Sequence, residues 1–277
     1  MKKLLLVDGM NLLFQMYYGM PVRITGPEGI AIQGTLGFVG ALLKIIRKVQ
    51  PTHLAVLFDG ECGNPRKEMD ADYKANRPDL PEEDSPFTQL PDVYRALDYM
   101  GICHAETTCC EADDWIAGYA IHFSGEMDVI ISSQDSDFFQ LISEHVSVLR
   151  YRGDKTVFCD RTYIHDKYGI EPEQYVAFKS LTGDTADNIR GADKVGPKTA
   201  AELINQFGSL EAMFTDADQI RKPSVRESIL RNQERIRLNH LLIRLDGAEE
   251  LPFSLEEMAF GGCHDSTMEV LRGIGLK

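Results

Sequence analysis

The sequence predicts an α/β protein in which a central, mostly parallel β-sheet is flanked by helices. Three short apolar runs, residues 4–7, 54–58 and 129–131, are continuous rather than alternating, which is typical of strands buried on both faces of a sheet. Segments with the apolar spacing of helices lie between these runs, and this alternation indicates parallel strands joined by helical crossovers. From about residue 161 onward the pattern becomes entirely helical.

Further elements follow from the spacing of apolar residues along the chain. It predicts helices in the first half of the chain over 36–49, 92–100 and 113–123. A further pair of strands is expected on either side of a Gly-Asp turn, over 146–150 and 156–159. In the second half, helices are expected over 172–181, 197–207 and 225–243, and a proline opens the first two of them.

Between residues 60 and 91 the composition changes. Basic and acidic residues mix around 64–77, and prolines at 78, 81, 86 and 91 then interrupt any helix. We therefore expect an excursion from the sheet, either a flap or a short helix followed by an extended segment.

Composition and charge restrict the class of protein. The 277 residues contain 29 Lys and Arg against 43 Asp and Glu, a formal net charge of −14, which argues against uniform coating of nucleic acid or of an anionic membrane. The apolar run at the N-terminus ends at Asp8, and no later stretch approaches the length of a membrane span. The six cysteines form no C-x-x-C pair. We expect a cytoplasmic protein with reduced thiols and no membrane partner.

Carboxylates follow each of the three apolar runs. Asp8 ends the first, Asp59 the second, and Asp135 and Asp137 the third. Because ligands of open α/β sheets bind beyond the carboxyl ends of the strands, these side chains are expected to converge. Aspartate is also a common turn residue after a strand. Because all three predicted strands are followed by aspartate, a shared site is favoured over three separate turns.

Five further acids extend this set: Glu111, Asp113, Asp114, Asp184 and Asp187. The first three stand at the start of a predicted helix, where capping is the alternative explanation. Nine carboxylates in one pocket repel one another unless cations neutralise them, and an all-oxygen set is suited to two Mg²⁺ or Mn²⁺ ions. Two such ions are suited to phosphodiester hydrolysis. The sequence contains no G-x-S-x-G or dinucleotide G-x-G-x-x-G motif.

Substrate phosphates also require positive charge. Arg66, Lys74 and Arg77 are candidates in the excursion, and the spacing of the last two is one helical turn, although a solvated helix has the same pattern. The stretch 190–199 is a second candidate, because a glycine-bearing turn that enters a helix at Pro197 offers backbone N–H groups to an anion. The basic stretch 221–240 is more simply explained as an exposed helix.

These residues resemble the motifs of the 5′ nuclease family, which includes flap endonucleases and the 5′–3′ exonuclease domain of bacterial DNA polymerase I. The resemblance extends from residue 4 to about residue 210. It rests on six ordered motifs: Val-Asp8-Gly, Phe-Asp59, Arg66 with Tyr73-Lys74-Ala-Asn-Arg77, Glu111-Ala-Asp113-Asp114, Asp135-Ser-Asp137, and Gly-Asp184-Thr-Ala-Asp187-Asn, the last leading into Val195-Gly196-Pro-Lys198-Thr199.

The resemblance implies a PIN-like sheet, a helical arch over the site within 61–91, and a helix–three-turn–helix element that binds DNA. It implies a first metal held by Asp8, Asp59, Glu111 and Asp113. It implies a second metal held by Asp135, Asp137 and Asp187, with Asp114 and Asp184 acting through water. It implies catalytic roles for Lys74, Arg77, Asp113 and Asp135. It also implies that Tyr73 stacks on a base of the DNA.

The DNA contacts implied by the resemblance are Gln15, Arg66, Tyr73, Arg190, Lys194, Val195, Gly196, Lys198 and Thr199, with a K⁺ ion at the turn over 191–199. Two of these depart from the family pattern. Gln15 stands where the family usually carries arginine, so a charge is missing. Lys194 stands at the first glycine of the family's Gly-Ile-Gly hairpin, which places the K⁺ site in question.

The sequence thus predicts a nuclease core over 1–160, a helical DNA-binding region over 161–245, and a segment 246–277 without an assigned role. The implied activity is metal-dependent cleavage of 5′ flaps or 5′ ends of DNA in replication and repair, by a monomer whose recruiting proteins the sequence does not identify. Two alternatives stay open: a non-catalytic or weakly catalytic DNA-binding homologue, and a ribonuclease acting on RNA–DNA hybrids.

Overall fold

A computed structural model describes residues 2–27, 29–60, 65–77, 85–248 and 250–277. Its main sheet has six strands in the order β3-β2-β1-β4-β5-β6, all parallel except β6. The strands are β1 (Lys3–Asp8), β2 (His53–Phe58), β3 (Cys103–Glu106), β4 (Asp128–Ser132), β5 (Val146–Arg150) and β6 (Val157–Cys159). The predicted mostly parallel α/β class is confirmed.

Alternate residues of the central strands pack into two separate cores. Leu4 and Leu6 of β1 belong to the core on one face, and Leu5 and Val7 to the core on the other. Both faces are therefore covered, which is why the apolar runs are continuous. The first face is covered by α5 (Ala112–Phe123), and the second by α1 (Gly9–Gly19), α2 (Gln33–Val49), α4 (Leu90–Tyr99) and α12 (Thr267–Gly273).

Helices α1 and α12 and strand β3 of this domain were not predicted. Helix α1 follows β1 without a loop, because Asp8 ends the strand and its carboxylate also accepts a hydrogen bond from the Asn11 amide at the start of the helix. Strand β3 lies at the edge of the sheet and is only partly buried, so it has no apolar run. The short helix α3 (Pro65–Met69) and η2 (Pro86–Gln89) flank the excursion, whose residues 61–64 and 78–84 lie outside the described part of the chain.

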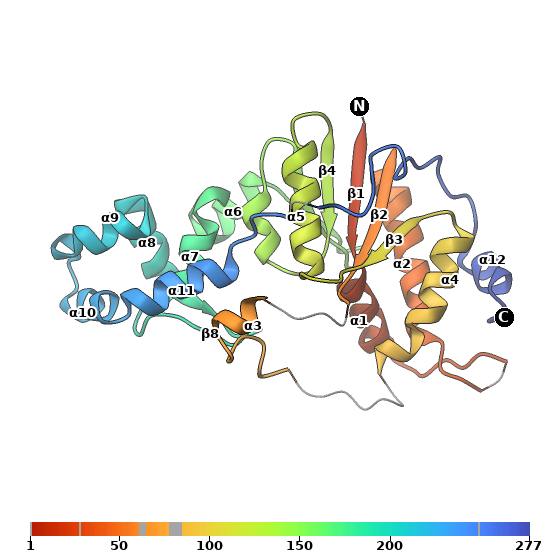
Figure 1. Cartoon of the computed structure of the whole chain (residues 1–277), viewed down its shortest axis with the longest axis horizontal. Helices are drawn as coiled ribbons and strands as arrows, with labels where there is room; N and C mark the ends of the chain where they lie inside the picture. The colour runs from red at the N-terminus through yellow and green to blue at the C-terminus, as the bar shows by residue number, and fades with distance from the viewer. Residues whose placement is uncertain (1, 28, 61–64, 78–84, 249) are drawn as a thin grey trace.

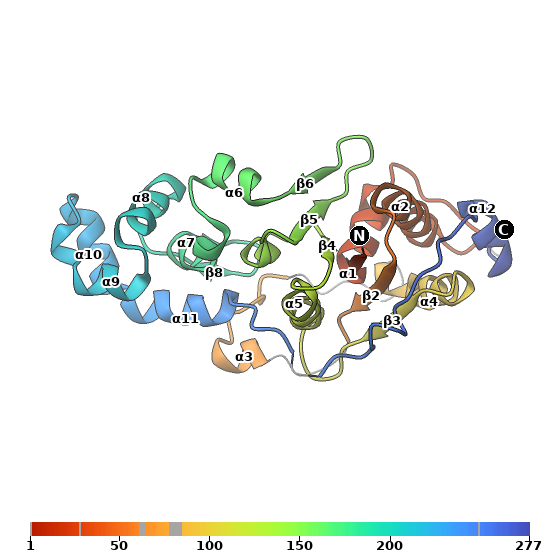
Figure 2. The ribbon, with the colours of Figure 1, turned by 90° about the horizontal axis from the view of Figure 1, so that it is seen from above.

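The helical region extends from one side of the sheet, with α10 near its far end and α12 at the opposite end of the molecule (Figure 2). Its helices are α6 (Arg161–Tyr168), α7 (Tyr175–Thr182), α8 (Pro197–Phe207), α9 (Leu210–Thr215), α10 (Pro223–Arg231) and α11 (Gln233–Ile243), with the short η4 (Pro172–Gln174) and η5 (Ala217–Gln219). The single helix predicted over 225–243 is wrong, because the chain breaks at Asn232. The entirely helical pattern is also interrupted, by the small hairpin of β7 (Gly183–Asp184) and β8 (Ile189–Arg190).

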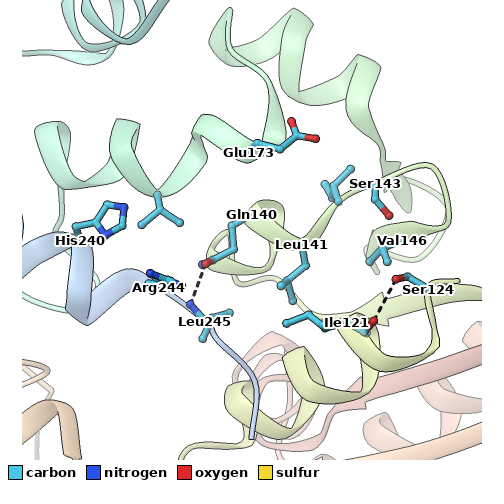
Figure 3. Close-up of a pocket in the computed structure, with 13 residues that line it drawn as sticks. Ile121, Ser124, Gln140, Leu141, Ser143, Val146, Glu173, His240, Arg244 and Leu245 are labelled. Carbon is cyan, nitrogen blue, oxygen red and sulfur yellow. Dashed lines mark hydrogen bonds between the residues drawn. The ribbon is translucent and has the colours of Figure 1, made fainter. Parts of the chain in front are cut away.

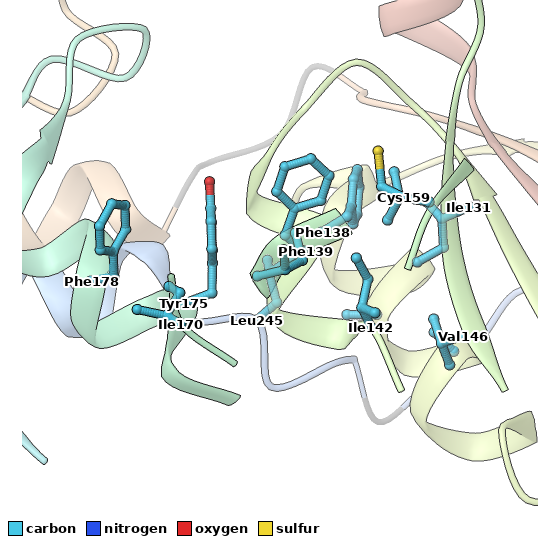
Figure 4. Packing of buried hydrophobic residues seen from close by; sticks show 14 of the residues in the cluster. Ile131, Phe138, Phe139, Ile142, Val146, Cys159, Ile170, Tyr175, Phe178 and Leu245 are labelled. Atoms are coloured by element: carbon cyan, nitrogen blue, oxygen red, sulfur yellow. The ribbon is translucent and has the colours of Figure 1, made fainter. Parts of the chain in front are cut away.

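Aromatic side chains join the sheet to this region. Phe138 and Phe139 of η3 (Asp137–Leu141) pack beside Tyr175 and Phe178 of α7 (Figure 4), and all four are almost fully buried. The segment that follows α11 returns to the sheet, where the Leu54 amide donates to the Met258 carbonyl over 2.9 Å. None of the described helices is long and apolar enough to cross a membrane.

Candidate active site at the carboxyl edge of the sheet

The strand order reverses between β1 and β4, so the carboxyl ends of these neighbours open toward a common site. Asp8 ends β1 and is buried; its Oδ2 accepts a hydrogen bond of 2.8 Å from Ser133 Oγ, beyond β4. Gly9 is required beside it, because a Cβ there would lie 2.4 Å from the Phe58 ring. Asp59, after β2, accepts a hydrogen bond of 2.7 Å from the Ala112 amide.

The start of α5 performs both roles that the sequence leaves open. Glu111 is the N-cap residue and forms a capping box with Asp114. Burial raises the pKa of Asp113, and the charges of Asp135, Asp8 and Asp59 raise it further. One helix terminus thus supplies a capping pair and a carboxylate that faces the strand ends.

The loop after β4 is held by its own acids. The Asp135 amide donates to Ser133 Oγ over 3.0 Å, and the Asp137 amide donates to Asp135 Oδ1 over 2.8 Å. Asp137 then opens η3, and its buried Oδ1 has no hydrogen-bond partner. The β7–β8 hairpin brings Asp184 and Asp187 to the same loop, since both contribute to the raised pKa of Asp137.

Gln140 fixes this loop against the helical region. Its side chain donates to the carbonyls of Asp137 and Ile243 and accepts from the Leu245 amide (Figure 3). An open pocket of about 480 Å³ lies on this side of η3. Asp137 does not line that pocket, whose one acid is Glu173, so the pocket is separate from the cluster of acids.

We call the nine acids Asp8, Asp59, Glu111, Asp113, Asp114, Asp135, Asp137, Asp184 and Asp187 the acid cluster. Burial raises the pKa of Asp8 to about 7, with contributions from Asp59 and Asp135. Burial is also the main cause of the raised pKa of Asp113 and Asp137. Asp135 acts on all three, so the acid cluster is electrostatically continuous and unfavourable for negative charge as it stands.

Four basic side chains partly neutralise the acid cluster. Lys74 forms an ion pair with Glu111, and Arg77 lies 3.0 Å from Asp187. Arg66 bonds to both Glu111 and Asp114 and also donates to the carbonyls of Leu242 and Arg244. The fourth is Lys179 of α7, which forms an ion pair with Asp184.

We call residues 65–77 the arch base. Two of its side chains that are predicted to contact DNA are buried in the protein. Arg66 is buried, and Tyr73 is only 4% exposed, packed among residues of α7 and α11 with its hydroxyl donating to Glu111. The helical spacing predicted for Lys74 and Arg77 is wrong, since residues 71–76 form turns and Lys74 has a φ of 56°. The DNA contacts of Arg66 and Tyr73 stay predictions that require these side chains to leave the acids.

No group of three or more His, Cys, Asp or Glu residues in the described part of the chain is arranged to hold a metal ion. Glu111, Asp114, Asp184 and Asp187 are instead paired with basic groups. The composition of the cluster nevertheless fits hard divalent cations: every side chain supplies oxygen, and Asp137 Oδ1 is buried without a partner.

Gln15 lies at the rim of the site but is committed to the backbone. Its Nε2 donates to the Tyr151 carbonyl over 2.7 Å, and Gln134 donates to the same oxygen over 2.8 Å. Both therefore anchor the start of the β5–β6 turn beside Asp135, a role that the sequence did not suggest. Sequence reasoning also missed Ser133, Asn11 and Lys179; a single lysine within the apolar pattern of α7 was the available signal for the last.

The predicted DNA-binding turn is exposed and ordered by backbone contacts. Arg190 pairs with Asp193 over 2.8 Å, and Lys194 has a φ of 63°. Val195 is buried and its amide donates to the Ala192 carbonyl. Helix α8 follows with Gly196 as N-cap, and Lys198 and Thr199 lie in its first turn. Lys194 therefore adopts the left-handed backbone conformation that glycine takes most easily.

The chain belongs to the 5′–3′ exonuclease family. The N-terminal resolvase-like domain of that family matches residues 3–169, and its C-terminal SAM fold matches residues 170–266. DNA polymerase I of Rhizobium leguminosarum is 36% identical over 262 residues, and the thermostable DNA polymerase I of Thermus thermophilus is 34% identical over 271. These matches cover 91% and 98% of this chain but only 25% and 31% of the polymerases.

Solved structures share the fold. The bacteriophage T5 5′-exonuclease with bound zinc has a TM-score of 0.73 at 21% identity, covering 99% of this chain and 98% of that one. A complex of the T5 flap endonuclease with DNA and metal ions has a TM-score of 0.71 at 21% identity, with the same coverage. The catalytic core of Rad2 with a DNA substrate has a TM-score of 0.61 at 16% identity, covering 99% and 92%.

Proposed function

We propose that the protein is a structure-specific 5′ nuclease that hydrolyses DNA phosphodiesters at 5′ flaps or 5′ ends. The acid cluster is the observation that carries this proposal: buried acids near the strand ends raise one another's pKa, and four basic side chains of the described residues pair with other acids of the cluster. Membership of the exonuclease family supports the reaction class. Two structural neighbours, the T5 flap endonuclease in complex with DNA and metal ions and the Rad2 catalytic core in complex with a DNA substrate, support the substrate class.

The cofactors we propose are two Mg²⁺ or Mn²⁺ ions. The first would be held by Asp8, Asp59, Glu111 and Asp113. The second would be held by Asp135, Asp137 and Asp187, with Asp114 and Asp184 acting through water. When bound, such ions supply positive charge and an activated water for phosphodiester hydrolysis. We propose catalytic roles for Asp113 and Asp135, because the charge of Asp135 acts on Asp8, Asp113 and Asp137, and burial among these acids raises the pKa of Asp113.

Lys74 and Arg77 have a second role in this proposal. As they lie, each neutralises a carboxylate of the acid cluster. If cations were held by these carboxylates, both side chains would be able to turn toward a scissile phosphate. Charged donors placed there stabilise the developing negative charge of the reaction. Tyr73 would then leave its apolar pocket and become available to a splayed base.

The exposed turn before α8 would hold the duplex. Arg190, Lys194 and Lys198 supply charge, while Gly196 and Thr199 place backbone and hydroxyl groups at the start of the helix. Val195 packs inward and supports the turn, at which a K⁺ ion remains part of the proposal. Gln15 would contribute only through its fixed amide. We further propose a cytoplasmic monomer with a core over 1–160, an arch over 61–91 and a DNA-binding region over 161–245.

The test uses a 5′-labelled DNA flap incubated with Mg²⁺, Mn²⁺ or EDTA, with the wild-type chain and the Asp135→Asn/Asp137→Asn double variant. We expect metal-dependent cleavage near the junction that the double variant loses. An RNA flap and an RNA–DNA hybrid run in parallel separate the ribonuclease alternative. Tight binding of the flap without cleavage in either metal would replace the proposal with a DNA-binding homologue.

A further inference from the structure

Helix α11 contacts the start of the turn before α8. The side chain of Asn239, in the second half of this helix, is fully buried. Its Nδ2 donates to the Arg190 carbonyl over 2.9 Å and to the Ser180 carbonyl over 3.0 Å. Arg190 ends β8, and the turn that is proposed to hold the duplex follows it directly. The start of this turn is therefore fixed to α11.

The C-terminal end of the same helix is held by Gln140 of η3 (Figure 3). Gln140 Nε2 donates over 2.9 Å to the carbonyl of Ile243, the last residue of α11, and its Oε1 accepts from the Leu245 amide over 2.9 Å. The last carbonyls of a helix have no partner within the helix, so this side chain caps α11. Ile243 lies one helical turn beyond Asn239, about 6 Å along the helix axis.

The same side-chain amide also holds the backbone beside the acids. Gln140 Nε2 donates to the Asp137 carbonyl over 2.8 Å, and the Asp137 amide donates to Asp135 Oδ1 over 2.8 Å. We call residues 133–141, which include these two acids, the acid loop. Because Gln140 and Ile243 are 103 residues apart in the sequence, this contact exists only in the folded protein.

Other contacts also join the sheet to the helical region, but they do not fix the acid loop in the same way. Phe138 and Phe139 pack against α7 through apolar surfaces, and such contacts are not directional. Arg66 donates to the carbonyls of Leu242 and Arg244, but its carboxylate partners are at the start of α5. The three hydrogen bonds of Gln140, in contrast, require one orientation of the acid loop relative to α11.

We propose that Gln140 is a positioning residue that transmits the position of the turn before α8 to the acid loop through α11. When a duplex orders or displaces this turn, Asn239 moves α11 with it, and Gln140 moves the backbone of Asp137. A helix can carry such a displacement because its own hydrogen bonds keep it rigid. The choice of the phosphodiester that is cut then depends on Gln140. This inference rests on the proposed function, since it takes the turn as the duplex contact.

The experiment measures amide hydrogen exchange by mass spectrometry in EDTA, without DNA and with a saturating duplex. Gln140→Met removes all three hydrogen bonds at a similar side-chain length, whereas Gln140→Glu keeps the acceptor for the Leu245 amide but loses both donors. Gln219→Met is the matched control, because Gln219 is exposed in η5, a short 3₁₀-helix like η3. We expect the duplex to slow exchange in the acid loop about tenfold in the wild type and the control, and less than about twofold in both Gln140 variants.

Cleavage of the 5′-labelled flap separates positioning from a loss of stability. With Mg²⁺, both Gln140 variants should keep KM within about twofold of the wild type, while kcat falls about tenfold. Their products should also spread over neighbouring phosphodiesters. A variant that was only less stable would still cut at the position that the wild type cuts.

Equal protection of the acid loop by duplex in the wild type and both Gln140 variants would overturn the proposal. If the wild type bound the duplex without protection of the acid loop, transmission through α11 would be wrong, while the proposed function would stand. If the wild type bound no duplex, both would fall. Should Gln140→Met fail to fold, Gln140→Glu gives the same comparison, because it keeps the bond to the Leu245 amide.

Discussion

The acids and the cations of the site come from regions of different construction. Most of the acids stand directly after strands of the main sheet or at the start of α5, where buried core residues fix the backbone. Three of the four cations come from the arch base, a five-residue helix followed by turns. The sheet therefore sets the geometry of the acids, whereas their neutralisation depends on a segment outside the sheet. In the proposed function, freeing Glu111, Asp114 and Asp187 for metal ions would need movement of the arch base, whereas Asp184 is paired with Lys179 of α7.

Within the arch base, Arg66 and Arg77 allow the largest test of this contrast. Arg66 is buried between two carboxylates and two carbonyls, whereas the Arg77 side chain is 57% exposed. Arg66→Gln leaves Glu111 and Asp114 as buried charges with one partner fewer, so we expect it to lower the free energy of unfolding by about 3 to 5 kcal/mol. Arg77→Gln should lower it by less than about 1 kcal/mol.

Urea unfolding of both variants in EDTA near neutral pH measures this difference. Arg95→Gln is a suitable control, because its partner Asp92 lies on the outer helix α4. Equal small losses for Arg66→Gln and Arg77→Gln would contradict the view that the buried pair, rather than the exposed one, holds the arch base down.

The strand-end acids allow a test by pH. The pKa of Asp8 is raised from 3.8 to about 7 in the folded protein, so the folded state binds a proton that the unfolded state has lost between these values. Stability from this group is present at low pH and is lost as pH rises toward about 7. Asp8→Asn should therefore be more stable than the wild type at about pH 8 in EDTA, by on the order of 4 kcal/mol, and equally stable only below about pH 3.

Urea unfolding across this pH range gives the two curves, and their difference removes the contribution of other titrating groups. Saturating Mg²⁺ should make the wild type more stable than Asp8→Asn at high pH, because the Asp8 carboxylate is stabilised by a bound cation and the asparagine amide is not. An advantage of Asp8→Asn that grows as pH falls would show that the folded protein stabilises the ionised form.

How far the sequence predicts the site depends on what each residue contacts. The strand-end acids were predictable, because an aspartate directly after a buried apolar run has its position set by the strand itself. The inward position of Arg66 was not, because its partners Glu111 and Leu242 are 45 and 176 residues away in the sequence. The same holds for Lys179 and Asp137, which meet only when α7 packs on η3. Strand β3 and the break at Asn232 were missed because edge exposure and helix interruption leave no apolar period.

The smallest expected effect concerns the turn before α8. Its basic side chains are exposed, whereas the acid cluster is negatively charged and largely buried. Lys194 has a φ of 63°, which costs a residue with a Cβ about 1 kcal/mol. Lys194→Gly should raise the free energy of unfolding by roughly 0.5 kcal/mol, since glycine also increases the entropy of the unfolded chain. In the proposed function the same variant loses a phosphate contact and should lower the salt slope of DNA binding by about one.

Lys194→Asn separates the two contributions, because asparagine tolerates this backbone conformation but carries no charge. Urea unfolding and titration of a duplex at several salt concentrations in EDTA measure stability and binding on the same proteins. We expect both variants to bind more weakly, while only their stabilities differ. If Lys194→Gly bound duplex with an unchanged salt slope, Lys194 would make no phosphate contact, and the positive charge for the duplex would come from other residues such as Arg190 and Lys198.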